Sequence, residues 1–354
     1  MIKEWFSLSD GRRKEIFNQT SQRAGLPASS IEKDWWVTMV LKTVFELEIS
    51  DHLVFKGGTS LSKGWDLINR FSEDIDFGID MDYLGFKGEP SKQNITRLRK
   101  ASFTFTNVQL REALNLKLIE NGFIDFEILP NEEKNTSMDP HSLILVYKSV
   151  TEERSVYIPP TVKLEVGARS LMEPFEPREI QSFVGYYFNG QKFADVPVSI
   201  NSVIPKRTFL EKAFLLHEEF QRVPERMRSE RMSRHLYDLE KIMDTIHGLD
   251  ALKDTELYNS IINHRNKFTK MDGVDYRTHH TSKIDFVPPA SIIKEYEKDY
   301  KSMQENMIYG DSLAFDDLIS RLKELRTRFR SLNHSPSKDT GNSLERKSTF
   351  AKGL

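Results

Sequence analysis

The chain has 354 residues, of which 38% are hydrophobic, 29% are charged and none is cysteine. The absence of cysteine excludes a disulfide framework, a thiolate zinc site and a cysteine nucleophile, and the length suggests two domains. With 51 basic and 53 acidic residues, the net charge of −2 excludes a histone-like polycation but not a local basic groove. The first residues lack the apolar core of a signal peptide, and no run of 18 apolar residues occurs, so we expect a cytoplasmic protein without a membrane span.

The first half of the chain mixes helical and strand patterns. Apolar residues recur every three or four positions over 12–48, and Ser29 and Ser30 predict the capped start of a helix with one buried stripe. Short apolar runs predict strands at 52–56 and 74–79, with a helix over 60–69 between them. A helix is expected over 92–122, and further strands over 124–129, 143–150, 156–158 and 161–166.

The second half of the chain has a different pattern. Helical spacing recurs over 208–220, 231–247, 254–267, 289–307 and 315–332. Strands followed by helices indicate an α+β domain and then a helical one, for which we expect the limits 1–204 and 205–333. Residues 334–354 are rich in Ser, Lys, Thr, Asn and Gly, a composition typical of a disordered tail.

Two neighbouring motifs carry the chemistry. In the first, residues 55–60 (Phe-Lys-Gly-Gly-Thr-Ser), a strand ends in two glycines and a helix begins, which presents backbone N–H groups to an anion. In the second, Asp74 and Asp76 lie two apart on a strand, so their carboxylates share one face and repel each other unless a cation lies between them. Oxygen ligands of this kind suit Mg²⁺, with Mn²⁺ as the alternative ion. A phosphate cradle beside a carboxylate pair is what nucleotidyl transfer requires.

Each motif alone also has an ordinary structural explanation. A Gly-Gly pair is a common turn, and an Asp-x-Asp pair is often a solvated strand face. No Gly-Lys-Ser/Thr follows at the spacing of a Walker loop. Close together, and each next to an apolar strand, the two motifs favour a functional site. We expect His217 and His235, in helical patterns, to be packed or hydrogen-bonded and not to bind metal.

At these residues the sequence resembles a known family. Residues 55–63 (Phe-Lys-Gly-Gly-Thr-Ser-Leu-Ser-Lys) and 70–77 (Arg-Phe-Ser-Glu-Asp-Ile-Asp-Phe) are similar to motifs of the AbiEii/AbiGii toxin family of nucleotidyltransferases, within the DNA polymerase β-like superfamily. Residues 31–35, 162–166, 205–212 and 234–239 resemble further segments of that family, and the resemblance spans roughly residues 10–332. It implies an α+β fold, in which a mixed sheet with flanking helices precedes a C-terminal α-helical domain.

The resemblance also implies roles for single residues. The implied nucleotide-binding residues are Gly57, Gly58, Thr59, Ser60, Lys63 and Ser72. The implied catalytic residues are Asp74, Asp76, Lys212 and Asp238. Asp74 and Asp76 would bind magnesium, and Lys212 would contact the triphosphate.

Glu165 and the arginines leave alternatives open. Glu165 alternates with apolar residues, so it is either a third metal ligand or base, or an outward-facing partner of Lys163. Five arginines between positions 222 and 234 form either a solvated helix face or a surface that follows RNA phosphates. Arg207 and Arg234 lie inside the family-like motifs, and we expect these two to contact RNA.

Three functional hypotheses follow. The first is a magnesium-dependent nucleotidyltransferase that attaches NMP from an NTP to an acceptor. The resemblance implies that it is the toxin of a toxin–antitoxin, abortive-infection system in phage defence, with a cognate antitoxin and the 3′ end of tRNA as the acceptor. The second keeps the chemistry, with a protein hydroxyl or a small molecule as acceptor. The third is a non-catalytic module that binds nucleotide or RNA. The presence of both Asp74 and Asp76 favours an enzyme.

Overall fold

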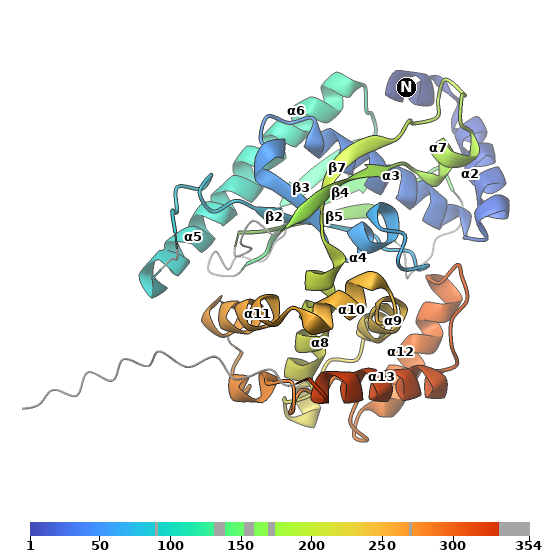
Figure 1. Ribbon diagram of the computed structural model, residues 1–354. Coiled ribbons are helices and arrows are strands. Elements are labelled where there is room, and N and C mark those ends of the chain that lie inside the picture. Colours follow the sequence, from blue (N-terminus) through green and yellow to red (C-terminus); the bar gives the residue numbers. More distant parts are fainter. Residues whose placement is uncertain (89–90, 131–138, 152–158, 169–173, 269–270, 333–354) are drawn as a thin grey trace, which may run out of the picture.

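The computed structural model describes residues 1–88, 91–130, 139–151, 159–168, 174–268 and 271–332 (Figure 1). The predicted strand over 156–158 and the predicted tail over 334–354 lie outside these residues. Within the described ranges, no helix combines the length and the apolar character needed to cross a bilayer.

A mixed seven-stranded sheet dominates the N-terminal half. Its strands are β1 (Leu53–Lys56), β2 (Asp74–Ile79), β3 (Phe126–Pro130), β4 (His141–Tyr147), β5 (Thr161–Gly167), β6 (Phe175–Ile180) and β7 (Val198–Val203). Their order across the sheet is β3-β4-β5-β2-β1-β7-β6. β2 pairs antiparallel with β1 and parallel with β5, so the strand that carries the two aspartates lies at the centre of the sheet. The predictions for β1 to β5 are confirmed, whereas β6 and β7 were not predicted.

Helices cover one face of this sheet. They are α1 (Ile2–Ser7), α2 (Asp10–Ala24), α3 (Ala28–Phe45), α5 (Lys92–Thr104), α6 (Arg111–Asn121) and α7 (Phe183–Tyr187). The prediction of a single buried stripe on α3 was wrong, because every residue from 28 to 44 is buried. The predicted serine cap was also wrong, since Pro27 holds the N-cap position and no side chain caps the helix. α3 lies between the sheet and α2, α6 and α7, which explains its burial on all sides.

Two other predicted helices differ in detail. The helix expected over 60–69 ends at Gly64, and it consists of α4 (Gly57–Thr59) followed by a π-helical turn, η2 (Ser60–Gly64). The helix expected over 92–122 is continuous, but a π-helical segment, η3 (Phe105–Leu110), joins α5 to α6.

Helices form the rest of the described chain and pack below the sheet in Figure 1. They are α8 (Pro205–Glu219), α9 (Ser233–Ile242), α10 (Ile246–Lys253), α11 (Thr255–Phe268), α12 (Ile293–Asn306) and α13 (Phe315–Arg330), with short 3₁₀ turns η1 (Ser50–His52), η4 (Pro224–Arg226) and η5 (Tyr276–His279). The single helix expected over 231–247 is two helices, α9 and α10. One hydrophobic core lies between the sheet and its helices, and a second fills the helical half. Leu61, Ile68 and Phe71 belong to the second core, so the segment after β1 joins the two halves.

Candidate active site

Three charged side chains lie in a row across neighbouring strands. The register pairs Lys56 of β1 with Asp76 of β2, and Asp76 with Glu165 of β5. Asp74 is paired with Lys163 two residues earlier along the same strands. Because side chains alternate along a strand, these groups share the sheet face opposite the N-terminal core. Glu165 also forms an ion pair with Lys163, which is the lysine partner expected from the sequence. The same glutamate is a neighbour of Asp76.

The glycine turn lies directly against Asp76 and Ser72. Gly57 has a φ of +77°, and a Cβ added to it would lie 1.9 Å from Oδ2 of Asp76. A Cβ on Gly58 would lie 2.7 Å from Nη2 of Arg70 and 2.9 Å from Oγ of Ser72. Real Cβ atoms do not approach this closely, so a side chain at Gly57 would displace Asp76, and one at Gly58 would displace Arg70 and Ser72. The turn and the carboxylate strand are therefore in contact.

Hydroxyl groups fix the turn to the start of β2. The Thr59 hydroxyl forms hydrogen bonds with Oγ of Ser72 at 2.9 Å and with the carbonyl oxygen of Asp74. Ser60 is buried, and its Oγ has no hydrogen-bond partner within the described part of the chain. Four of the predicted nucleotide-binding residues, together with Ser72, thus form one compact unit beside the two aspartates.

Burial and mutual repulsion act on the two aspartates. Burial, followed by the nearby charges of Glu165 and Asp74, raises the pKa of Asp76 to about 7. Burial also raises the pKa of Asp74, while Arg234 is the strongest charge that opposes this rise. No three acidic or histidine side chains converge into a ready-made metal site among the described residues. The donor set nevertheless fits a hard divalent cation, because a cation would relieve the repulsion between neighbouring carboxylates.

Asp238 and Lys212 contact each other. The Asp238 carboxylate is fully buried and accepts hydrogen bonds from Nε and Nη2 of Arg70, at 2.7 and 2.8 Å. Nζ of Lys212 lies 2.8 Å from the same carboxylate. Burial alone would raise the pKa of Asp238, but the two cations outweigh it and hold that pKa far below its usual range. No role was predicted for Arg70, because its partner Asp238 is 168 residues away in the chain.

A second ion-pair group links the two halves of the molecule. Glu73, directly before Asp74, is buried and pairs with Lys33 of α3 at 2.5 Å and with Arg231 before α9. Burial lowers the pKa of Lys33 to about 8, although the charge of Asp74 favours its protonated form. The charged groups around Asp74 thus come from segments far apart in the sequence. No role was predicted for Lys33 or Glu73.

Lys63 lies on the other side of the glycine turn. Its Nζ pairs with Asp34 at 2.5 Å and donates to the carbonyl oxygen of Gln181 at 3.3 Å. It lines a pocket of about 490 Å³, which it shares with Arg70 and Ser72. Five aromatic side chains also line this pocket, namely Phe71, Phe183, Tyr186, Tyr187 and Tyr309.

A smaller pocket lies between the sheet and the helical half. Its volume is about 310 Å³, with Asp76 and Glu165 on the sheet side and Arg207 and His264 on the helical side. Arg207 is 5% exposed, and its Nε lies 3.1 Å from Glu211 one turn along α8. This pocket between the sheet and the helical half borders the carboxylate row at Asp76 and Glu165.

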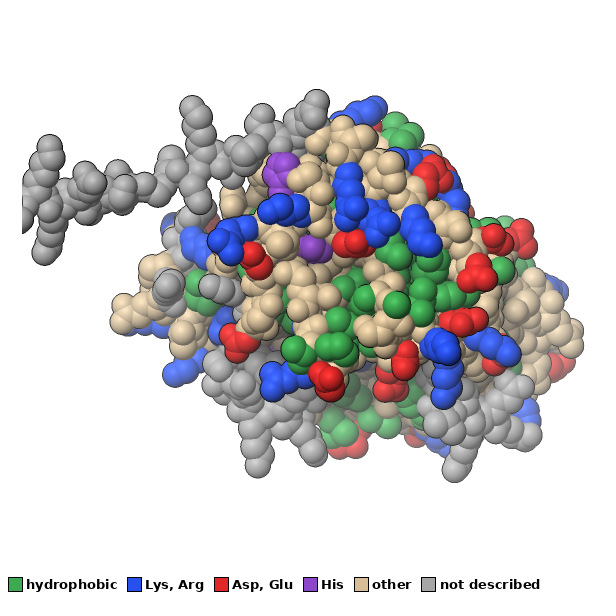
Figure 2. All heavy atoms as spheres, turned by 90° about the horizontal axis from the view of Figure 1, so that it is seen from below, with side chains coloured by type: hydrophobic (Ala, Val, Ile, Leu, Met, Phe, Trp, Pro, Cys, Tyr) green, Lys and Arg blue, Asp and Glu red, His purple; other side chains and the backbone are tan. Residues whose placement is uncertain are grey.

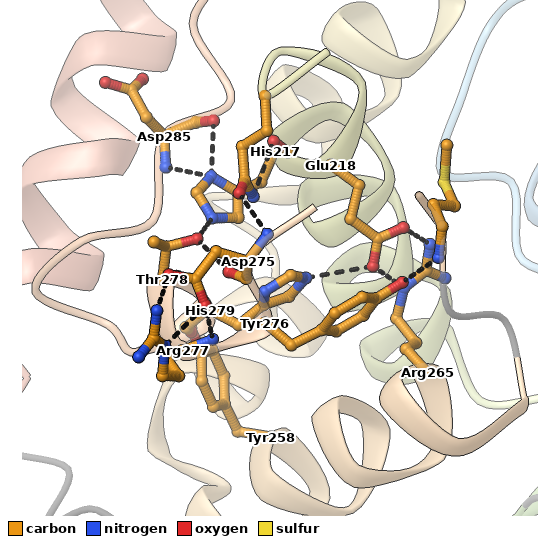
Figure 3. A network of polar contacts seen from close by, with 12 residues as sticks. His217, Glu218, Tyr258, Arg265, Asp275, Tyr276, Arg277, Thr278, His279 and Asp285 are labelled. Carbon is orange, nitrogen blue, oxygen red and sulfur yellow. Dashed lines mark hydrogen bonds and ion pairs between the residues drawn. The ribbon is translucent and has the colours of Figure 1, made fainter. Parts of the chain in front are cut away.

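His217 and His235 are both buried, as expected, and His217 is also hydrogen-bonded. His217 lies between the backbone of Asp285 and the hydroxyl of Thr278, which is 2.9 Å from its Nε2 (Figure 3). Nε2 of His279 lies 3.0 Å from Glu218, which also pairs with Arg265. This network fastens the segment after α11 to α8.

Comparison with known proteins places the chain in a family. The model of the nucleotidyl transferase AbiEii toxin family, of type IV toxin–antitoxin systems, matches residues 40–321. The chain therefore belongs to this family of nucleotidyltransferase toxins. Among solved structures it resembles MenT4, a nucleotidyltransferase toxin from Mycobacterium tuberculosis H37Rv, with a TM-score of 0.53 and 15% identity over 90% of each chain. JHP933 from Helicobacter pylori is similar at a TM-score of 0.39 and 14% identity, over 84% of this chain and 91% of that one. No curated protein matches the sequence.

Proposed function

We propose that the protein transfers NMP from an NTP to the 3′-terminal hydroxyl of an RNA, most naturally a tRNA, in a magnesium-dependent reaction. The contact between the glycine turn and Asp76 carries this proposal, because it puts an anion cradle and a carboxylate row at one point. In this proposal the protein is the cytoplasmic toxin of an abortive-infection system that defends against phage, and a cognate antitoxin restrains it.

The metal would be held by Asp74 and Asp76, with Glu165 as the third oxygen ligand. When bound, Mg²⁺ or Mn²⁺ would stabilise the charge that develops on the phosphate oxygens. Burial, followed by the charges of Glu165 and Asp74, raises the pKa of Asp76, and a bound cation would offset both effects.

The chain's own residues bind the two substrates on opposite sides of the aspartates. Backbone N–H groups at Gly57 and Gly58, with the hydroxyl of Ser72, would bind the β- and γ-phosphates, because this turn lies against Asp76. Lys212, held by Asp238, would contribute a positive charge to the same phosphates. The acceptor hydroxyl would enter through the interdomain pocket beside Glu165, where Arg207 would contact the RNA.

In the transfer step, the acceptor oxygen forms a bond to the α-phosphorus, and the bond from that phosphorus to the bridging oxygen of the β-phosphate breaks. Pyrophosphate leaves with the electron pair, and Glu165 accepts the proton of the attacking hydroxyl.

One labelling experiment tests this function and separates it from its alternatives. Purified protein is incubated with each α-labelled NTP, Mg²⁺ and either total RNA or total protein, and the products are separated on gels. Label on tRNA that disappears with a chelator and returns with Mg²⁺ is the expected result. Label on protein would replace the RNA acceptor by a protein hydroxyl. Nucleotide binding without any transfer would indicate a non-catalytic module.

A further inference from the structure

Five cationic side chains gather beside the glycine turn and Asp74. They are Lys33, Arg70, Lys212, Arg231 and Arg234. They come from α3, from the segment before β2, from α8, and from α9 with the residues before it. Such a concentration of like charge destabilises the fold unless anions accompany it.

Two buried carboxylates balance only part of this charge. Asp238 contacts both Arg70 and Lys212. Glu73 contacts both Lys33 and Arg231. Each carboxylate thus faces two cations, and Asp74 and Asp299 are further acidic groups that act on Lys33 and Arg231.

Arg234 differs from the other four cations. Its Nε is buried and has no hydrogen-bond partner among the residues that the structure describes. It precedes Asp238 by one turn of α9, so it lies on the same helix face as the residue that anchors Lys212 and Arg70. It also acts electrostatically on Asp74, Lys212 and Arg231. Arg234 therefore brings a buried donor without an acceptor to the group around Asp74 and Lys212.

Another basic face of the molecule is internally neutralised. Figure 2 shows Lys and Arg side chains gathered on the face of the helical half that is turned away from the sheet. On α13, Arg328 and Arg321 pair with Asp244, and Arg326 pairs with Asp285. Those arginines already have carboxylate partners, which makes the surroundings of Arg234 the stronger anion site.

We propose that Arg234 binds the triphosphate of the donor nucleotide and remains on the pyrophosphate as it leaves, and that it does not contact the RNA acceptor. This inference rests on the proposed function. A guanidinium binds phosphate oxygens through two parallel hydrogen bonds, and its charge is permanent. A triphosphate would supply the missing acceptor for Nε. Arg234 lies one turn before Asp238, which holds Lys212, and it acts electrostatically on Lys212, so it is assigned to the same donor side as that lysine.

Nucleotide binding without turnover tests this directly. The affinities for α-labelled NTP and for inorganic tripolyphosphate are measured with Mg²⁺ in the full chain and in Arg234→Ala, Arg234→Lys and Arg226→Ala. Arg226, exposed in η4, is a matched control from the same arginine-rich segment. We expect Arg234→Ala to weaken both ligands by about tenfold or more, Arg234→Lys to weaken them less, and Arg226→Ala to leave both unchanged.

The outcomes separate the inference from the function on which it rests. Unchanged affinity in Arg234→Ala, or a raised KM for RNA with an unchanged KM for NTP, would overturn the role of Arg234. If Arg234→Ala does not fold, Arg234→Lys decides the matter, because a lysine lacks the paired donors and must weaken tripolyphosphate binding. If the wild type binds NTP more tightly than Arg234→Ala does, but transfers no NMP, the proposed function is refuted and the inference about Arg234 stands.

Discussion

The buried ion pairs of Asp238 with Arg70 and Lys212 predict that variants of Asp238 lose stability. Asp238→Asn keeps the size of the side chain and removes its charge. Arg70 and Lys212 are 2% and 7% exposed, so the substitution leaves two buried cations without a counter-charge. Three short charge-assisted hydrogen bonds, of 2.7, 2.8 and 2.8 Å, would be lost or weakened.

The expected cost is large for a single substitution. Breaking a buried ion pair by removing one partner costs about 3–5 kcal/mol, because the remaining charge stays buried and unpaired. With roughly 2 °C of melting temperature for each kcal/mol, the melting temperature should fall by about 6–10 °C. Lys212→Met is the matched control: it leaves the Arg70–Asp238 pair with both of its hydrogen bonds and should cost clearly less.

Thermal unfolding followed by circular dichroism measures both variants. A melting temperature of Asp238→Asn within about 1 °C of the wild type would refute the reasoning, since the carboxylate would then not balance buried charge. If the melting temperature falls as expected, a loss of activity in Asp238 variants would result from displacement of Lys212 and Arg70. Asp238 would then be a positioning residue.

Further predictions concern the turn and a buried histidine. Gly57→Ala should lower NMP transfer at least about tenfold more than Gly85→Ala, because both positions have positive φ but only at Gly57 would the Cβ meet Asp76; equal activities in the transfer assay would argue against the contact. Burial lowers the pKa of His217 to about 4, and the unfolded chain binds this proton near pH 6.5, so stability should fall by up to about 3 kcal/mol as the pH drops from 6.5 to 4. Urea unfolding at several pH values should show a weaker fall in His217→Gln, and identical pH profiles would contradict the assignment.

The sequence predicted the centre of the molecule well. A strand ending in two glycines and an Asp-x-Asp strand are local patterns, and β1, the turn and β2 appear where expected. The alternation around Glu165 also predicted its face, and the register places it beside Asp76. These features depend on neighbours in the chain, which a sequence shows directly.

What the sequence could not supply comes from contacts between distant segments. β7 lies next to β1 through a short parallel pairing at Phe55 and Ser202, and its residues lack a continuous apolar run. β6 contains Pro177, which edge strands tolerate and which weakens a strand prediction. The roles of Arg70 and Glu73 depend on distant partners. Arg70 pairs with Asp238, 168 residues away, and Glu73 pairs with Arg231, 158 residues away. The burial of α3 on all sides depends on α2, α6 and α7 meeting around it.

The role of Asp76 is tested most directly by NMP transfer from α-labelled NTP to RNA, measured with Mg²⁺ in wild type and Asp76→Asn at equal amounts of folded protein. Loss of one carboxylate from the row should reduce transfer by at least about a hundredfold while the melting temperature is kept or raised, because removing a repelled, buried charge does not destabilise the sheet. Transfer by Asp76→Asn at a rate close to that of the wild type would contradict the assignment of the carboxylate row as the site of catalysis.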